Sequence, residues 1–159
     1  MLFRSPASLA DAPDMSIYFK DIASKSQPSR LTNGSNPQFT RDGLKFLFVR
    51  GGQIFESLLE VNANPKPLFT ARGFNAGPKF SPNGIEVLFT STRGDHSFIG
   101  VYHTINRTVR WIAPDVTNDI SPAWSPDGKS ISFFRFPGKK IGDLDNYTVG
   151  SRFSVMVAD

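Results

Sequence analysis

A seven-residue pattern recurs three times along the chain, and this recurrence constrains the fold more than any other feature of the sequence. The pattern reads proline, any residue, an aromatic residue, serine or threonine, any residue, aspartate or asparagine, and glycine. It occupies residues 37–43, 78–84 and 122–128, so its copies begin 41 and 44 residues apart. Four-stranded blades of β-propellers repeat at about 40–45 residues. The sequence therefore predicts an all-β fold built from tandem propeller blades.

Each residue type in the pattern has a structural role in such a blade. Proline is tolerated where a strand opens, because its missing N–H group is not needed there. We expect the aromatic residue to point inward between neighbouring blades, and the Asp-Gly or Asn-Gly pair to supply the positive φ of a tight hairpin turn. The predicted turn residues are Asp42, Gly43, Asn83, Gly84, Asp127 and Gly128, and the predicted blade-packing aromatics are Phe39, Phe80 and Trp124.

Stretches rich in apolar residues supply the other strands of each repeat. Those that directly follow the turns, at 44–50, 85–90 and 130–136, are typical of strands covered on both faces. Further strands are expected at 16–22, 30–32, 53–61, 67–70, 98–104, 109–112 and 151–158. The predicted domain is a partial propeller over residues 1–159, with a half blade at 14–33, blades at 36–70 and 77–113, and an incomplete blade at 121–159.

The number of predicted strands has a consequence for closure. Three to four blades of four antiparallel strands are at the low end of the roughly 4–8 blades that propellers usually contain. Closure into a three-bladed ring is the alternative, and it would make a very small, strained circle. We expect a fragment of a larger propeller, with possible self-association through its open blade edges.

Composition and charge exclude several kinds of site. The chain has no cysteine, which rules out disulfides, thiolate metal sites and cysteine nucleophiles. Its two histidines belong to no ligand-spaced cluster, so we expect neither a metal nor a cofactor. The net charge of +4 comes from scattered Lys and Arg residues and predicts no nucleic-acid partner.

The first ten residues lack the apolar core of a secretory signal and no stretch could cross a membrane, so we expect a soluble chain of the cytoplasm or periplasm.

A polar segment at 93–97 is the most distinctive loop of the sequence. It places Asp95 beside His96, a pairing that can serve general-base catalysis. Nothing in the sequence puts a nucleophile within reach, so we predict no catalytic residue and interpret the segment as a turn. Arg93, Asp95 and His96 are retained as predicted surface contacts. The longest polar connection, at 137–147, is interpreted as a surface loop.

The repeated pattern, fullest at 122–128, resembles the repeats of TolB-type propellers and of prolyl oligopeptidase family propellers. A narrower resemblance, over residues 90–102, 109–114 and 121–138, is to the N-terminal propeller of bacterial dipeptidyl-peptidase-like members of that family. In that family the propeller precedes an α/β-hydrolase domain and restricts substrates to peptides. The resemblance therefore implies a non-catalytic propeller with that hydrolase domain and peptide substrates as its partners.

The sequence departs from the family pattern in several places. Arg41 replaces the second proline of the repeat and Asn83 replaces the aspartate, although asparagine preserves the turn chemistry. No Gly-x-Ser-x-Gly nucleophile motif is present, so no catalytic role is transferred to any residue. The glutamates, Glu56, Glu60 and Glu86, include no adjacent pair of the kind that holds a peptide amino terminus in dipeptidyl peptidases.

Two functional hypotheses follow. In the first, the chain is the propeller part of a serine peptidase and gates and positions peptides for a hydrolase domain. In the second, it is a TolB-like propeller that acts as a protein–protein interaction module. A nucleophile motif downstream of Asp159 would distinguish the first from the second, whereas further blades followed by a stop would favour the second.

Overall fold

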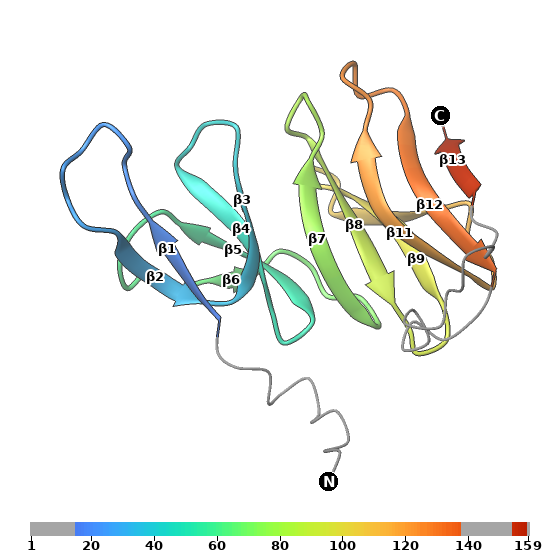
Figure 1. The fold of residues 1–159 in the computed structure, drawn as a ribbon, viewed down its shortest axis with the longest axis horizontal. Helices are drawn as coiled ribbons and strands as arrows, with labels where there is room; N and C mark the ends of the chain where they lie inside the picture. The colour runs from blue at the N-terminus through green and yellow to red at the C-terminus, as the bar shows by residue number, and fades with distance from the viewer. Residues whose placement is uncertain (1–14, 138–153, 159) are drawn as a thin grey trace, which may run out of the picture.

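The computed structural model describes residues 15–137 and 154–158, which form β-strands and turns without any helix (Figure 1). The strands are β1 (Ser16–Phe19), β2 (Ser29–Asn33), β3 (Ser35–Phe39), β4 (Lys45–Arg50), β5 (Gln53–Leu58), β6 (Lys66–Pro67), β7 (Phe74–Phe80), β8 (Glu86–Thr92), β9 (Ser97–His103), β10 (Thr108–Ile112), β11 (Thr117–Trp124), β12 (Ile131–Pro137) and β13 (Ser154–Ala158). The predicted all-β class is confirmed. Most of the loop predicted at 137–147, and the start of the strand predicted at 151–158, lie outside the described residues.

The strands pair in chain order into antiparallel units. Strands β3–β6 form one four-stranded sheet, which we name the first blade, and β7–β10 form the second blade. Strands β11–β13 form the third blade, which joins the second through a single parallel bridge between Asn118 and Ser97. Strands β1 and β2 pair only with each other, as an N-terminal hairpin beside the first blade (Figure 1). The sheets of the described residues do not close into a ring.

The proline of each repeat lies inside a strand. Pro78 and Pro122 fall in the middle of β7 and β11, at the position where the register against the next strand shifts. The residues before the three prolines, Asn36, Gly77 and Ser121, all have a positive φ, of 50°, 62° and 54°. A positive φ beside a shifted register is the geometry of a β-bulge, which accommodates a residue that cannot donate to the ladder. The prediction that proline opens each strand is therefore wrong.

The three turns share one hydrogen-bond arrangement. In the first, the Gly43 N–H donates to the Thr40 carbonyl at 3.0 Å, and the Asp42 carboxylate accepts from the Thr40 hydroxyl at 2.6 Å and from the Leu44 N–H at 3.0 Å. The hydroxyl bond, followed by the backbone bond, lowers the pKa of Asp42 below its usual value. The second and third turns repeat these bonds around Asn83 and Asp127. Within each turn motif only the glycine takes a positive φ, of 70°, 76° and 72°.

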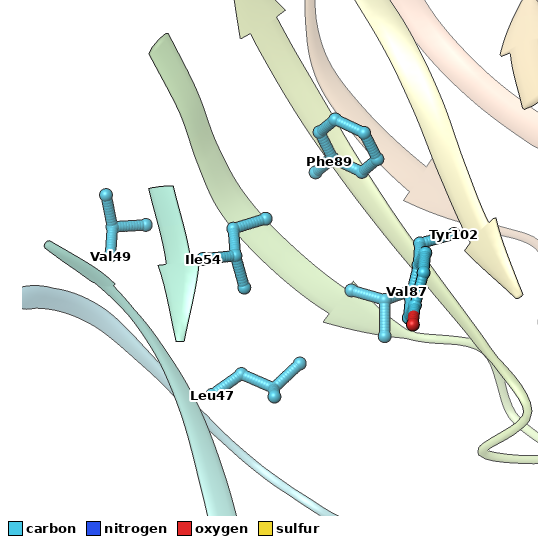
Figure 2. Close-up of a cluster of buried hydrophobic side chains, with 6 residues drawn as sticks. All are labelled: Leu47, Val49, Ile54, Val87, Phe89 and Tyr102. Atoms are coloured by element: carbon cyan, nitrogen blue, oxygen red, sulfur yellow. The ribbon is translucent and has the colours of Figure 1, made fainter. Parts of the chain in front are cut away.

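Strands β4 and β8, the second strands of the first two blades, are buried on both faces because their side chains alternate between two cores. In β12 only one face is buried, since Ile131 and Phe133 are covered whereas Phe134 is 39% exposed, so the predicted burial of 130–136 on both faces is wrong. Phe46 and Phe48 of β4 pack with Ile17 of the hairpin, whereas Leu47 and Val49 point the other way. That opposite face meets the second blade in a buried cluster, drawn in Figure 2: Leu47, Val49, Ile54, Val87, Phe89 and Tyr102. A second cluster joins the second and third blades: Leu88, Ile99, Val101, Ile112, Ile131 and Phe133. The hydrophobic core therefore lies between blades.

The aromatic residues of the repeat occupy these inter-blade layers to different extents. Phe80 packs against the cluster between the first and second blades, and Trp124 against the cluster between the second and third. Phe39 makes an edge contact with Phe19 of the hairpin but remains 52% exposed. Packing at Phe39 is partial because only the two-stranded hairpin lies on that side in the described part of the chain.

Replacement of Gly128 by valine is expected to destabilise the chain by more than about 1 kcal/mol, because a β-branched residue resists a positive φ. Gly128 also touches the neighbouring blade, since a Cβ there would lie 3.2 Å from Cδ of Pro82. Gly43 is the matched control, with the same φ and no atom within 4 Å of its would-be Cβ. In urea unfolding, Gly43→Val should lose only the free energy that valine costs at a positive φ. Gly128→Val should lose more, because its side chain also meets Pro82. Equal losses would show that the inter-blade contact contributes nothing.

Candidate functional site

A groove of about 760 Å³ lies between the first and second blades, on the side where their pattern turns emerge. We refer to it as the inter-blade groove. Its apolar floor consists of Leu68, Phe80 and Tyr102. Tyr102 is only 4% exposed and its ring stacks on Phe69 at a centroid distance of 4.6 Å. The floor is therefore the outer boundary of the buried cluster between the two blades and is held rigidly by it.

The walls of the groove carry four basic side chains and two carboxylates: Arg41, Lys45, Lys66, Arg107, Asp42 and Glu56. Lys45 is paired with Glu56 at 3.0 Å, and Arg41 crosses to the second blade, where its Nη1 donates to the Pro82 carbonyl at 3.2 Å. The side chains of Lys66 and Arg107 form no hydrogen bond or ion pair with any residue that the structure describes. Two positive charges are therefore available to a ligand in the groove.

The boundary that contains the groove lacks two hydrogen bonds that are present at the next boundary. Between the second and third blades, Trp124 Nε1 donates to the Lys79 carbonyl at 3.2 Å, and Lys79 Nζ donates to the Pro122 carbonyl at 2.8 Å. The equivalent positions one repeat earlier are Phe80, which has no N–H donor, and Gln38, whose amide reaches only the Phe39 carbonyl at 3.5 Å. The first and second blades meet instead through the buried cluster and through other bonds, among them the Arg41–Pro82 bond and a bond from the Asn75 N–H to the Gly52 carbonyl at 2.8 Å.

The predicted surface contacts Arg93, Asp95 and His96 do not reach this groove. Strand β8 begins next to the groove and ends at Thr92, so these three residues lie at its opposite end, in the turn before β9. The turn is closed by a bond from the Arg93 N–H to the His96 carbonyl at 2.8 Å, and Nδ1 of His96 lies 2.6 Å from the Asp95 carboxylate. Ser97, the residue after His96, is fully buried and donates its hydroxyl to the Asp119 carbonyl at 2.7 Å rather than to His96.

Sequence reasoning missed the groove because its residues come from different repeats. Lys66 lies in β6, the last strand of the first blade, Arg107 lies in the turn between β9 and β10, and Tyr102 lies in β9. No short motif joins them, and only the packing of one blade against the next brings them together. The one local signal was Arg41, a cation that replaces the second proline of the repeat.

In the portion of the chain that is described, no three His, Asp or Glu side chains gather closely enough to hold a metal ion. Over that same portion, no helix has the length and apolarity needed to cross a membrane.

Comparison with solved structures places the chain among β-propellers. TolB from Acinetobacter baumannii superposes with a TM-score of 0.67 and 25% identity, over 91% of this chain and 35% of that one. A protein described as TolB from Agrobacterium tumefaciens gives 0.61 and 21%, over 83% and 48%. A luciferin-regenerating enzyme, at 0.58 and 15% over 82% and 47%, shares the fold alone. No protein-family model and no curated protein matches the sequence. The chain thus spans between a third and a half of the length of the structures it resembles.

Proposed function

We propose that this chain is a non-catalytic, TolB-like propeller segment that binds another protein, and that the inter-blade groove is the docking site. The likeness to two TolB structures supports the interaction-module hypothesis. The alternative, a propeller that gates peptides for an α/β-hydrolase domain, remains a prediction that none of the comparisons supports. Self-association through the open edges likewise remains a prediction.

The observation that carries the proposal is the chemistry of the groove. An apolar floor of Leu68, Phe80 and Tyr102 is flanked by the uncompensated cations of Lys66 and Arg107. Apolar surface provides affinity when it is buried by a partner, and charges at the rim of a site select a partner of opposite sign. This combination suits an extended protein segment in which apolar residues alternate with carboxylates.

Fluorescence anisotropy with two labelled peptides tests the proposal, one alternating leucine with glutamate and the other leucine with lysine. The acidic peptide is expected to bind more tightly, with an affinity that falls as salt is added. The double variant Lys66→Glu, Arg107→Glu should weaken its binding by about tenfold or more, because two attractive charges become repulsive.

The control variant is Lys20→Glu, Lys25→Glu, which changes the net charge equally at the exposed N-terminal hairpin. It should bind the acidic peptide as the parent chain does. If both double variants lost the same affinity for the acidic peptide, the effect would be due to net charge alone. If the parent chain bound the two peptides equally well, the groove would be refuted as the site.

A further inference from the structure

A second feature, separate from the groove, lies at the opposite end of the second blade. The guanidinium carbon of Arg93 is 5.0 Å from the centroid of the Phe98 ring and 4.8 Å from that of Trp111. Nε of Arg93 is buried and has no hydrogen-bond partner. The guanidinium forms no ion pair or hydrogen bond with the described residues. Arg93 is therefore held in place by two aromatic rings while its donors remain unused.

Two other arginines of the chain stack on aromatic rings, and both have acceptors. Arg50 lies over Phe48 and Phe55, and its Nε donates to the Asn33 carbonyl at 3.2 Å while Nη2 donates to the Thr32 hydroxyl. Arg135 lies over Phe133, and its Nε and Nη2 each donate to the Asp119 carboxylate at 2.8 Å. Of these three stacked arginines, only Arg93 lacks an acceptor.

The lack of an acceptor for Nε of Arg93 is energetically unfavourable for the folded chain. A buried donor without a partner is destabilising, and such groups are rare in folded proteins unless something unseen satisfies them. The rings of Phe98 and Trp111 fix the guanidinium plane in advance, so little side-chain entropy remains to be lost when a ligand binds. A guanidinium that is fixed but unpaired is arranged for an acceptor from outside the chain.

We propose that Arg93 is a binding site for a carboxylate group carried by a partner molecule. A carboxylate presents two oxygens that match the paired Nη donors of a guanidinium, and the chain itself pairs a guanidinium with a carboxylate between Arg135 and Asp119. Phe98 and Trp111 flank the site and offer apolar contact to the carbon chain that bears the carboxylate. The site does not depend on the inter-blade groove, so either proposal can fail without the other.

The test observes the Nε–H group of Arg93 directly by proton–nitrogen correlation spectroscopy of the 159-residue chain. The signal is assigned by its loss in Arg93→Lys, a variant that keeps the charge and removes the planar fork. Sodium acetate is added at constant ionic strength against sodium chloride, and sodium phosphate forms a separate arm. The Nε–H signal of Arg50, which is stacked but already bonded, is the internal control.

Acetate is expected to shift the Arg93 signal saturably and to leave the Arg50 signal in place. The remaining spectrum of Arg93→Lys should match that of the parent chain and should not respond to acetate, which separates loss of binding from loss of fold. A saturable response to phosphate alone would overturn the assignment of a carboxylate. No saturable response in either arm, or equal shifts of both arginine signals, would overturn the site.

Discussion

Replacement of Asp119 by alanine is expected to destabilise the chain by about 3–5 kcal/mol, the usual cost of removing one partner of a buried ion pair. Asp119 is 0% exposed and accepts two hydrogen bonds from Arg135, whose side chain is 18% exposed. Arg135 also donates to the Ala113 carbonyl at 2.6 Å, in the connection between the second and third blades. Without the carboxylate, a positive charge remains in a site that excludes most water.

The guanidinium cannot escape this cost by losing its proton, because an arginine stays protonated even without a partner. In the parent chain the hydrogen bond to Asp119 raises the pKa of Arg135 further. Urea unfolding followed by the fluorescence of Trp111 and Trp124 measures the loss. The double variant Asp119→Leu, Arg135→Met removes both charges and should be more stable than Asp119→Ala alone. A loss below about 1 kcal/mol in Asp119→Ala would contradict the buried pairing.

Replacement of Phe89 by alanine should cost a comparable amount, about 3–5 kcal/mol, because it empties the centre of the cluster between the first and second blades. The Phe89 ring is fully buried, 4.9 Å from the Phe69 ring and 5.7 Å from that of Trp111. The ring also lies directly over Gly100. A Cβ at Gly100 would be 2.7 Å from Cε1 of Phe89 and closer still to Cζ.

This close approach gives the second prediction an internal check. Gly100→Ala alone should destabilise the chain by about 1–3 kcal/mol, since the ring has no room to retreat. In the presence of Phe89→Ala, the added methyl group enters the space that the ring has left. The double variant should therefore be more stable than the sum of the two single losses predicts. Strict additivity in urea unfolding would show that Gly100 and Phe89 do not oppose each other in solution.

Features that depend on neighbouring residues in the sequence were predictable. The turns needed only a hydroxyl, an Asp or Asn two residues later and a glycine, and these recur at 40–43, 81–84 and 125–128. Burial of both faces was predicted correctly for β4 and β8 from their apolar-rich sequences, but not for β12, where Phe134 is exposed. The β-bulge at each proline was missed because a bulge is defined by the pairing of two strands, and the sequence shows only one of them at a time.

Features that depend on packing between repeats were not predictable. Gln38 and Phe80, at the boundary between the first and second blades, occupy the positions that Lys79 and Trp124 occupy at the next boundary. No local rule predicts from this difference that a groove lies at the earlier boundary. Arg93 was identified as a surface residue, yet its isolation from any acceptor depends on where the Phe98 and Trp111 rings lie. The candidate sites of this chain are therefore identified by residues that differ between repeats rather than by the pattern that the repeats share.

The alternation along β4 and β8 has a further consequence for how the chain can be altered. Each of these strands contributes one face to the buried cluster on one side of its sheet and the other face to the cluster on the opposite side. A cut at a blade boundary would consequently divide a core rather than separate two modules. Excising or duplicating a blade would preserve the buried layers only if the new neighbours offered complementary side chains. Residues on the facing sides of two adjacent sheets must therefore change together when a blade is gained or lost.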